Sequence, residues 1–385
     1  MDFDINQIPL VDPTRVGPDG RPLDYQIALD PHNNVAMFRD LSQGGRLVKL
    51  DLGPADVHYD RPLATYAVGY SLKNQYLIAD KAMPVVMVDK ASDYYYVWDK
   101  DDVFQPVNPT VGAAGANIGE ISPRQSKTPF VTLQYAIRTF LPTEVEANAD
   151  AALRIGMRYL QLPLDRLLLA RELRVATAVM NASNYAAAYK QTLGATEKWN
   201  GGSASDPVKN LLDRIDAALR PITSIVMSAR TYNAFTQNAQ VQKYVASKTA
   251  IKPRAGVENA SEWSALLELP PIIIGREKYK NTATTYGYIW GNNVALLTHP
   301  PEMPPMGTPI SCNTFRWTGG LATGVNAQQA AMFGQISVEQ GWGVRTYYDP
   351  TRGAQGGKAC VAFMQDAEQF VDDAVSGLIV DAFQP

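Results

Sequence analysis

Residues that could do chemistry are scattered through this sequence without the spacing that common catalytic motifs require. A phosphate-binding loop built on Gly357-Lys358 would need a glycine at 352 and a hydroxyl residue at 359, where the chain has Arg352 and Ala359. A dinucleotide-binding turn built on Gly341-x-Gly343 would need a third glycine where Thr346 stands. The sequence therefore predicts no nucleotide-dependent enzyme.

One acidic cluster resembles a metal-binding loop at first sight. Asp99, Asp101 and Asp102 resemble the start of a calcium loop, but Phe104 takes the place of the required glycine and Thr110 that of the bidentate glutamate. The pattern favours a solvated, charged turn after a strand.

Histidine and cysteine are equally sparse. His32, His58 and His299 each lack a second histidine or a cysteine at ligand spacing, so we expect structural histidines. Cys312 and Cys360 are too far apart to suggest a disulfide framework or a metal cluster, which favours a reducing cytosol. We expect no catalytic residue, metal or cofactor.

Composition indicates a large globular chain. Its 385 residues are 46% hydrophobic and 19% charged, enough for two domains or for one core with a large insertion. The net charge of -3 and the absence of a basic stripe argue against tight nucleic-acid binding. The beginning of the chain has neither the basic region nor the apolar core of a signal peptide, and no apolar run approaches the ~20 residues that span a bilayer.

The elements that would surround any site begin with an irregular segment. Residues 1 to 62 are rich in proline, glycine and aspartate, which predicts little regular structure. Phe3 and Ile5 are among the apolar residues that could anchor such a segment. It either orders on a neighbouring molecule or wraps over its own domain, and the sequence leaves both open.

Strands and a long loop follow. The runs Pro84 to Val88 and Tyr94 to Trp98 predict strands, and Phe130 to Phe140 predicts another by its alternation. Between them, residues 105 to 128 contain prolines and glycines but almost no large apolar side chains. We expect an extended hairpin arm with a glycine-rich tip.

A helical block is predicted from Thr143, with Glu146 completing a capping box. Leucines recur at helical spacing up to Leu168, and Pro163 predicts a kink or a break. Residues 143 to 205 would form this unit.

An α/β lobe is predicted for residues 206 to 335. Asp206 and Ser228 are expected to cap helices, Ile272 to Ile274 to form a strand, and 286–290 with 294–298 to form a hairpin. The last residues, 336 to 385, predict strands that pack on the long helix. The whole is an α+β chain in which the lobe is an insertion.

Several motifs resemble, in order, those of the major capsid proteins of tailed bacteriophages. The densest lies in 76–98, with Ile78-Ala-Asp80, Pro84-Val-Val86, Val88-Asp-Lys90 and an aromatic run. The others, which extend the likeness over most of residues 66 to 320, are Asn148-Ala-Asp150, Ser224-Ile-Val-Met-Ser228, Tyr288-Ile-Trp-Gly291, Val294-Ala-Leu-Leu297 and Phe315-Arg-Trp317.

The resemblance implies the Hong Kong 97-like capsid fold. In its terms, 1–62 is the N-terminal arm, 63–142 the peripheral strands with the E-loop, 143–205 the spine helix, 206–335 the axial domain and 336–385 the remaining peripheral strands. The implied function is a virion shell of pentamers and hexamers, assembled in the host cytoplasm. The expected partners are further copies of the chain, a separate scaffolding protein, a portal and decoration proteins, around double-stranded DNA that is not bound specifically.

Two alternatives stay open: an encapsulin-type nanocompartment shell and an enzyme of unrecognised class. Lys127, near the E-loop, is the residue at which covalent crosslinking between subunits would be sought. The expected contacts between subunits involve Phe3, Ile5, Val111, Ile118, Arg124 and Lys127.

Overall fold

The computed structural model describes 25–29, 36–40, 46–49, 76–98, 125–148, 155–201, 203–248, 259–280, 284–299, 310–317, 336–337 and 342–384. Near the beginning of the chain, β1 (Tyr25–Leu29), β2 (Ala36–Asp40) and β3 (Arg46–Lys49) form an antiparallel sheet. The sequence predicts that regular structure in this segment does not extend far, and these strands are only 5, 5 and 4 residues long.

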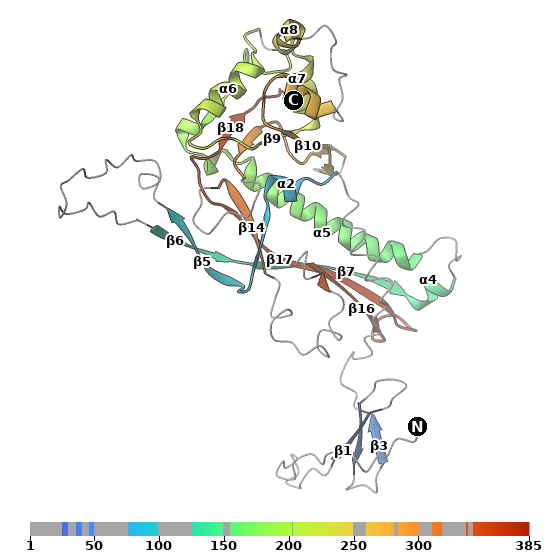
Figure 1. Cartoon of the computed structure of the whole chain (residues 1–385). Helices are drawn as coiled ribbons and strands as arrows, with labels where there is room; N and C mark the ends of the chain where they lie inside the picture. The colour runs from blue at the N-terminus through green and yellow to red at the C-terminus, as the bar shows by residue number, and fades with distance from the viewer. Residues whose placement is uncertain are drawn as a thin grey trace, which may run out of the picture.

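A mixed six-stranded sheet forms the elongated part of the molecule (Figure 1). Its central strand, β17 (Gly357–Phe370), pairs along its first part with β7 (Leu133–Pro142) and β16 (Trp342–Asp349), and further on with β14 (Cys312–Trp317). At one edge β4 (Val85–Val88) runs parallel to β14, and at the other β15 (Ile336–Ser337) pairs with β16.

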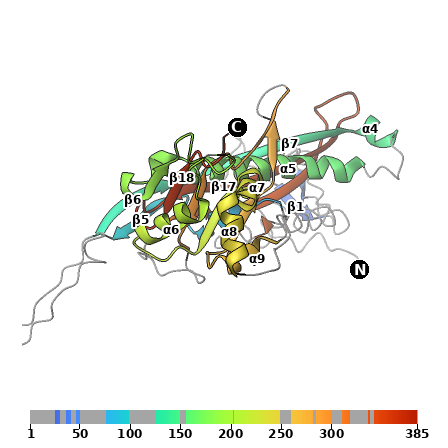
Figure 2. The same cartoon turned by 90° about the horizontal axis from the view of Figure 1, so that it is seen from above.

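The long helix α5 (Ile155–Val179) lies along this sheet (Figures 1 and 2). Leu164 and Leu167 pack against Cys360, Ala362 and Met364 of β17. The shorter α4 (Thr143–Ala147) directly follows β7. The predicted capping box is wrong, because Thr143 lies inside α4 and its hydroxyl contacts the Gly356 carbonyl instead.

The predicted break at Pro163 does not occur: α5 is continuous through that residue. A proline has no N–H to donate to the carbonyl four residues earlier, which here belongs to Tyr159. The Thr139 hydroxyl of β7 donates to that carbonyl at 2.7 Å. The strand thus supplies the donor that the helix lacks.

A five-stranded sheet forms the second lobe, in the order β10 (Ile272–Gly275), β9 (Ser224–Ser228), β13 (Val294–Leu297), β18 (Gly377–Val380) and β8 (Lys190–Thr192). One face packs on α6 (Pro207–Ala217), α7 (Ala229–Gln237), α8 (Ala239–Lys248) and α9 (Ala260–Leu266). The other face, through Val226, Ala295 and Leu378, packs on Val175 and Val179 near the end of α5. Between α5 and β8 the chain makes two short 3₁₀ turns, η4 (Ala182–Asn184) and η5 (Ala187–Tyr189).

The predicted caps of this lobe are confirmed. The Asp206 side chain accepts from the Lys209 amide at the start of α6, with Pro207 in the first position, and Ser228 accepts from Thr231 at the start of α7.

The predicted hairpin between 286–290 and 294–298 is wrong. Instead β12 (Tyr286–Tyr288) pairs with β11 (Lys278–Lys280), while β13 lies between β9 and β18. All four residues of β13 are buried, so the strand satisfies its backbone in the middle of a sheet instead of at an edge.

Three strands lie on the far side of predicted boundaries. β14, within 206–335, pairs with β17 and β4 of the six-stranded sheet. β8, within 143–205, and β18, within 336–385, pair with each other in the five-stranded sheet. The chain therefore crosses between the lobes more than once. Among the described residues, no helix combines the length and the apolar character needed to span a membrane.

Candidate functional site

A two-stranded ribbon projects from the six-stranded sheet (Figure 1). It consists of β5 (Ser92–Trp98) and β6 (Gln125–Val131), which pair antiparallel, with Tyr95 opposite Thr128 and Tyr96 opposite Lys127. The predicted return strand began at Phe130, so the predicted tip of 105–128 included residues of β6. The first residues of β6 are Gln, Ser, Lys, Thr and Pro, so the strand lacks the alternation of apolar and polar residues by which a strand is recognised in a sequence.

The inner face of this ribbon is anchored by aromatic packing. Phe130 stacks on Phe315 of β14 with 4.5 Å between ring centroids, and Tyr95 lies 5.4 Å from the same ring. Ala367 of β17 completes the cluster. Because an isolated two-stranded hairpin is marginally stable in water, this contact is what holds the ribbon in place.

The outer face of the ribbon is apolar and uncovered within the described part of the chain. Tyr94 and Val131 are 55% and 60% exposed, and Pro129 and Tyr96 are exposed beside them. The Lys127 ammonium lies 5.4 Å from the Tyr96 ring centroid. Contiguous exposed apolar surface of this kind usually marks an interaction site.

Thr132 joins the ribbon to the sheet. Its amide and its hydroxyl both donate to the Ala91 carbonyl, at 2.8 and 2.9 Å, and the Gln365 amide donates to the same hydroxyl at 3.1 Å. These contacts fix the point at which the chain passes from β6, which pairs with β5, to β7, which pairs with β17.

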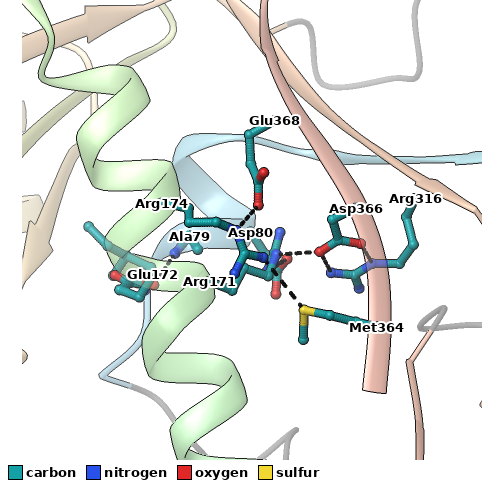
Figure 3. A network of polar contacts seen from close by, with 10 residues as sticks. Ala79, Asp80, Arg171, Glu172, Arg174, Arg316, Met364, Asp366 and Glu368 are labelled. Carbon is teal, nitrogen blue, oxygen red and sulfur yellow. Dashed lines mark hydrogen bonds and ion pairs between the residues drawn. The ribbon is translucent and has the colours of Figure 1, made fainter. Parts of the chain in front are cut away.

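A buried ionic network lies where α5 crosses β17 (Figure 3). Asp366, fully buried, accepts two hydrogen bonds from Arg316 at 2.7 and 2.8 Å, in fork geometry. Arg171 lies 3.3 Å from the same carboxylate and 2.6 Å from Asp80 of α2 (Ala79–Ala82). The network connects α2, α5, β14 and β17.

Arg174 extends this network by one helical turn. Its Nε donates to Glu368 at 2.8 Å, and its guanidinium lies 3.5 Å from the centroid of the Tyr135 ring in β7. Burying such a cluster costs desolvation free energy, but its charges are all paired in only one position of the helix on the strands, so the cluster favours that position.

Glu172 points the other way, towards α2 and the second lobe. Its carboxylate accepts from the amides of Ile78 and Ala79, at 3.0 and 2.8 Å, and from the Trp290 indole at 2.6 Å. It therefore caps α2 from outside, since the first amides of a helix have no partner within it. Burial raises the pKa of Glu172 more than these hydrogen bonds lower it.

The expectation that His299 is structural is confirmed. Its Nε2 donates to the Ala82 carbonyl at 2.9 Å, and burial lowers the pKa of the imidazole to about 4. Cys312 lies 3.9 Å away, but burial holds the pKa of its thiol far above the ordinary value, so the pair has no reactive thiolate.

Lys127 is the predicted contact residue that the structure describes, on the outer face of the ribbon. Phe3, Ile5, Val111, Ile118 and Arg124 lie outside the described residues, as do Asp99, Asp101 and Asp102. Among the described residues there is no group of three His, Cys, Asp or Glu side chains that could hold a metal ion.

Sequence reasoning missed the ionic network, although one signal was present. Arg171 stands four residues after Leu167 and four before Val175, so it falls on the buried stripe of the helix, where an arginine needs a partner. Its partner Asp366, and Arg316, which pairs with the same carboxylate, come from distant strands and carry no local signal.

Comparison with known proteins gives one curated match in sequence. The chain is 24% identical over 219 residues to the major capsid protein of Pseudomonas phage JBD67, which covers 57% of this chain and 69% of that protein. No family model matches.

In structure, the chain is similar to a phage-related protein from Bordetella bronchiseptica, with a TM-score of 0.61 and 19% identity over 85% of this chain and 98% of that one. The capsid of cyanophage P-SCSP1u gives a TM-score of 0.49 and 9% identity, over 78% and 86% of the two chains. The predicted α+β class is confirmed by the two mixed sheets and their helices, and the predicted resemblance to phage major capsid proteins is confirmed over the 219 matched residues.

Proposed function

We propose that this chain is the major capsid subunit of a tailed bacteriophage and assembles with further copies of itself into the closed head that surrounds the genome. The observation that carries the proposal is the sequence match to a phage major capsid protein over 219 residues, together with the shared fold. The role is structural, in the virion, and requires no catalytic residue or cofactor.

The β5–β6 ribbon supports this role physically. Its outer face is apolar, and its root is anchored through Phe130 and Phe315. A surface that is rigidly held yet uncovered fits a contact made only after assembly. We propose that this ribbon is the base of the E-loop, that it lies across a neighbouring subunit, and that Lys127 is part of the contact. Phe3, Ile5, Val111, Ile118 and Arg124 remain proposed contacts of the N-terminal arm and of the loop.

The other parts of the proposal follow the capsid fold. In it, 1–62 is the N-terminal arm, α5 the spine helix, the six-stranded sheet the peripheral domain and the lobe around the five-stranded sheet the axial domain. A shell closed by symmetry makes many modest contacts collectively hard to undo. A separate scaffolding protein, a portal and decoration proteins belong to the same proposal, with assembly in the host cytoplasm.

The curated sequence match is to a phage capsid protein, so we favour a phage head over an encapsulin-type compartment. The net charge of -3 fits a container that surrounds DNA without binding it specifically.

Electron microscopy of the purified full-length chain, expressed with and without the neighbouring phage genes, tests the proposal. We expect icosahedral particles or capsomers. A chain that stays monomeric under all assembly conditions would contradict the shell function.

The loop that the ribbon carries is tested by deleting residues 108 to 124, which leaves β5 and β6 whole. We expect a folded subunit with unchanged circular dichroism that no longer closes into particles. Normal particles from this deletion would refute the arm contact while leaving the shell function intact.

A further inference from the structure

An open pocket of about 510 Å³ lies in the second lobe, beside the first turns of α7. Arg230, Asn233 and Gln237 of that helix line it, together with Tyr288 of β12 and Phe383 near the end of the chain. Residues three and four apart share a helix face, so the three polar side chains form one row along the pocket.

Arg230 is the only one of these five lining residues that carries a charge. Its guanidinium lies 4.0 Å from the Phe383 ring centroid, and within the described part of the chain it forms no ion pair. A cation in the first turn of a helix is electrostatically unfavourable for that helix. Apart from its cation–π contact with Phe383, the arginine has no oppositely charged partner among the described residues, which suits an acidic partner.

A complementary surface lies on α6 of the same lobe. Leu212 of α6 and Leu219, which lies two residues beyond the end of that helix, are 41% and 38% exposed. Asp213 and Asp216 are exposed between them and form no ion pair among the described residues. The stripe thus combines apolar surface with two unpaired negative charges.

The two surfaces lie over different halves of the five-stranded sheet. In the order β10, β9, β13, β18, β8, helix α7 contacts β9 and β10 whereas α6 contacts β18, and Figures 1 and 2 show the two helices apart. Two different surfaces that fit each other produce a head-to-tail contact, which closes into a ring if the rotation allows it.

We propose that the pocket beside α7 receives the α6 stripe of a second copy of this chain, with Arg230 paired to Asp213 and Asp216 and the two leucines packed against Tyr288 and Phe383. This inference rests on the proposed shell function and names the residues that select the partner. The apolar residues supply buried area, and the charges set register and exclude wrong pairings.

Charge exchange tests the contact. Arg230→Glu and the pair Asp213→Lys with Asp216→Lys each place like charges together, and we expect each to raise the protein concentration needed for assembly by about tenfold or more. The chain that carries all three changes restores opposite charges at every contact and should assemble near the wild-type concentration. Glutamate is acceptable in the first turn of α7, and lysine is acceptable at Asp216 in the last turn of α6 and at the exposed Asp213 just before that turn, so both variants should fold.

Lys243→Glu is the matched control, because it makes the same charge change as Arg230→Glu at an exposed residue of α8 that is neither a lining residue of the pocket nor part of the α6 stripe. Light scattering and native mass spectrometry measure assembly, and circular dichroism checks folding. Unchanged assembly of both reversed variants, or no recovery in the triple variant, would overturn the inference. Failure of the wild-type chain to assemble would instead count against the proposed function.

Discussion

The contact between Thr139 and the long helix makes a quantitative prediction. Pro163 cannot donate to the Tyr159 carbonyl, and the Thr139 hydroxyl does so in its place at 2.7 Å. Thr139→Val keeps the shape of the side chain but removes the donor. A half-buried carbonyl left without a partner costs about 1–2 kcal/mol, so we expect the free energy of unfolding to fall by that amount.

A double-mutant cycle isolates the cause. In a Pro163→Ala background, the new amide of residue 163 can donate to the Tyr159 carbonyl as in any helix. Thr139→Val should then cost about 0.5 kcal/mol or less, which gives a coupling of about 1 kcal/mol between positions 139 and 163.

Thr177→Val is the matched control in the same helix. Its hydroxyl also donates to a carbonyl, that of Leu173, at 2.7 Å, but this carbonyl keeps its helical amide partner. We expect a change of about 0.5 kcal/mol or less. Urea denaturation followed by circular dichroism measures the wild type and all four variants. Equal costs of Thr139→Val in both backgrounds would refute the idea that the strand compensates for the proline.

Three further predictions concern the junction between the lobes and the packing of α5 on the six-stranded sheet. Gly275→Ala would place a Cβ 2.1 Å from the Trp290 ring, so we expect a lower melting temperature, checked by calorimetry, whereas an unchanged value would show that the ring moves freely. Glu172→Gln turns an amide NH₂ towards groups that donate hydrogen bonds and should cost about 1–3 kcal/mol at neutral pH in urea denaturation. Because the pKa of Glu172 is raised in the folded state, protonation of this carboxyl stabilises the fold at pH values below the ordinary pKa of 4.5, and that stabilisation is lost as pH rises through the raised pKa. The Gln variant has no proton to lose, so this part of the pH dependence of the unfolding free energy should be absent from it. Asp366→Asn removes the negative charge that two buried arginines share, so we expect the free energy of unfolding to fall by about 3–5 kcal/mol in the same assay. If the loss were no larger than that caused by replacing an exposed aspartate, the network would not have the structural role described above.

The order of the motifs, rather than any single motif, made the fold accessible from the sequence. Local patterns predicted α6 from its aspartate cap and first-position proline, and the buried strands β9 and β10 from their short apolar runs. These patterns work because each acts within a few residues of the backbone that it shapes.

The candidate surfaces were only partly predictable. The hairpin ribbon was expected, but its return strand β6 was not, because its residues alternate weakly and its inner face is selected by contact with Phe315. The pocket beside α7 joins residues from 230, 288 and 383, and no sequence spacing indicates their proximity.

By itself, the sequence determined the helices α5, α6 and α7, the buried strands with clear apolar patterns, the absence of the common catalytic motifs, and the likeness to phage capsid proteins. Only the tertiary structure decided which strands pair, why α5 continues through Pro163, and where Arg171 finds its counter-charges. The reason is physical. Helix caps and hydrophobic periodicity act over neighbouring residues, whereas a missing backbone donor or a buried charge is satisfied by whichever distant segment the fold brings within hydrogen-bonding distance.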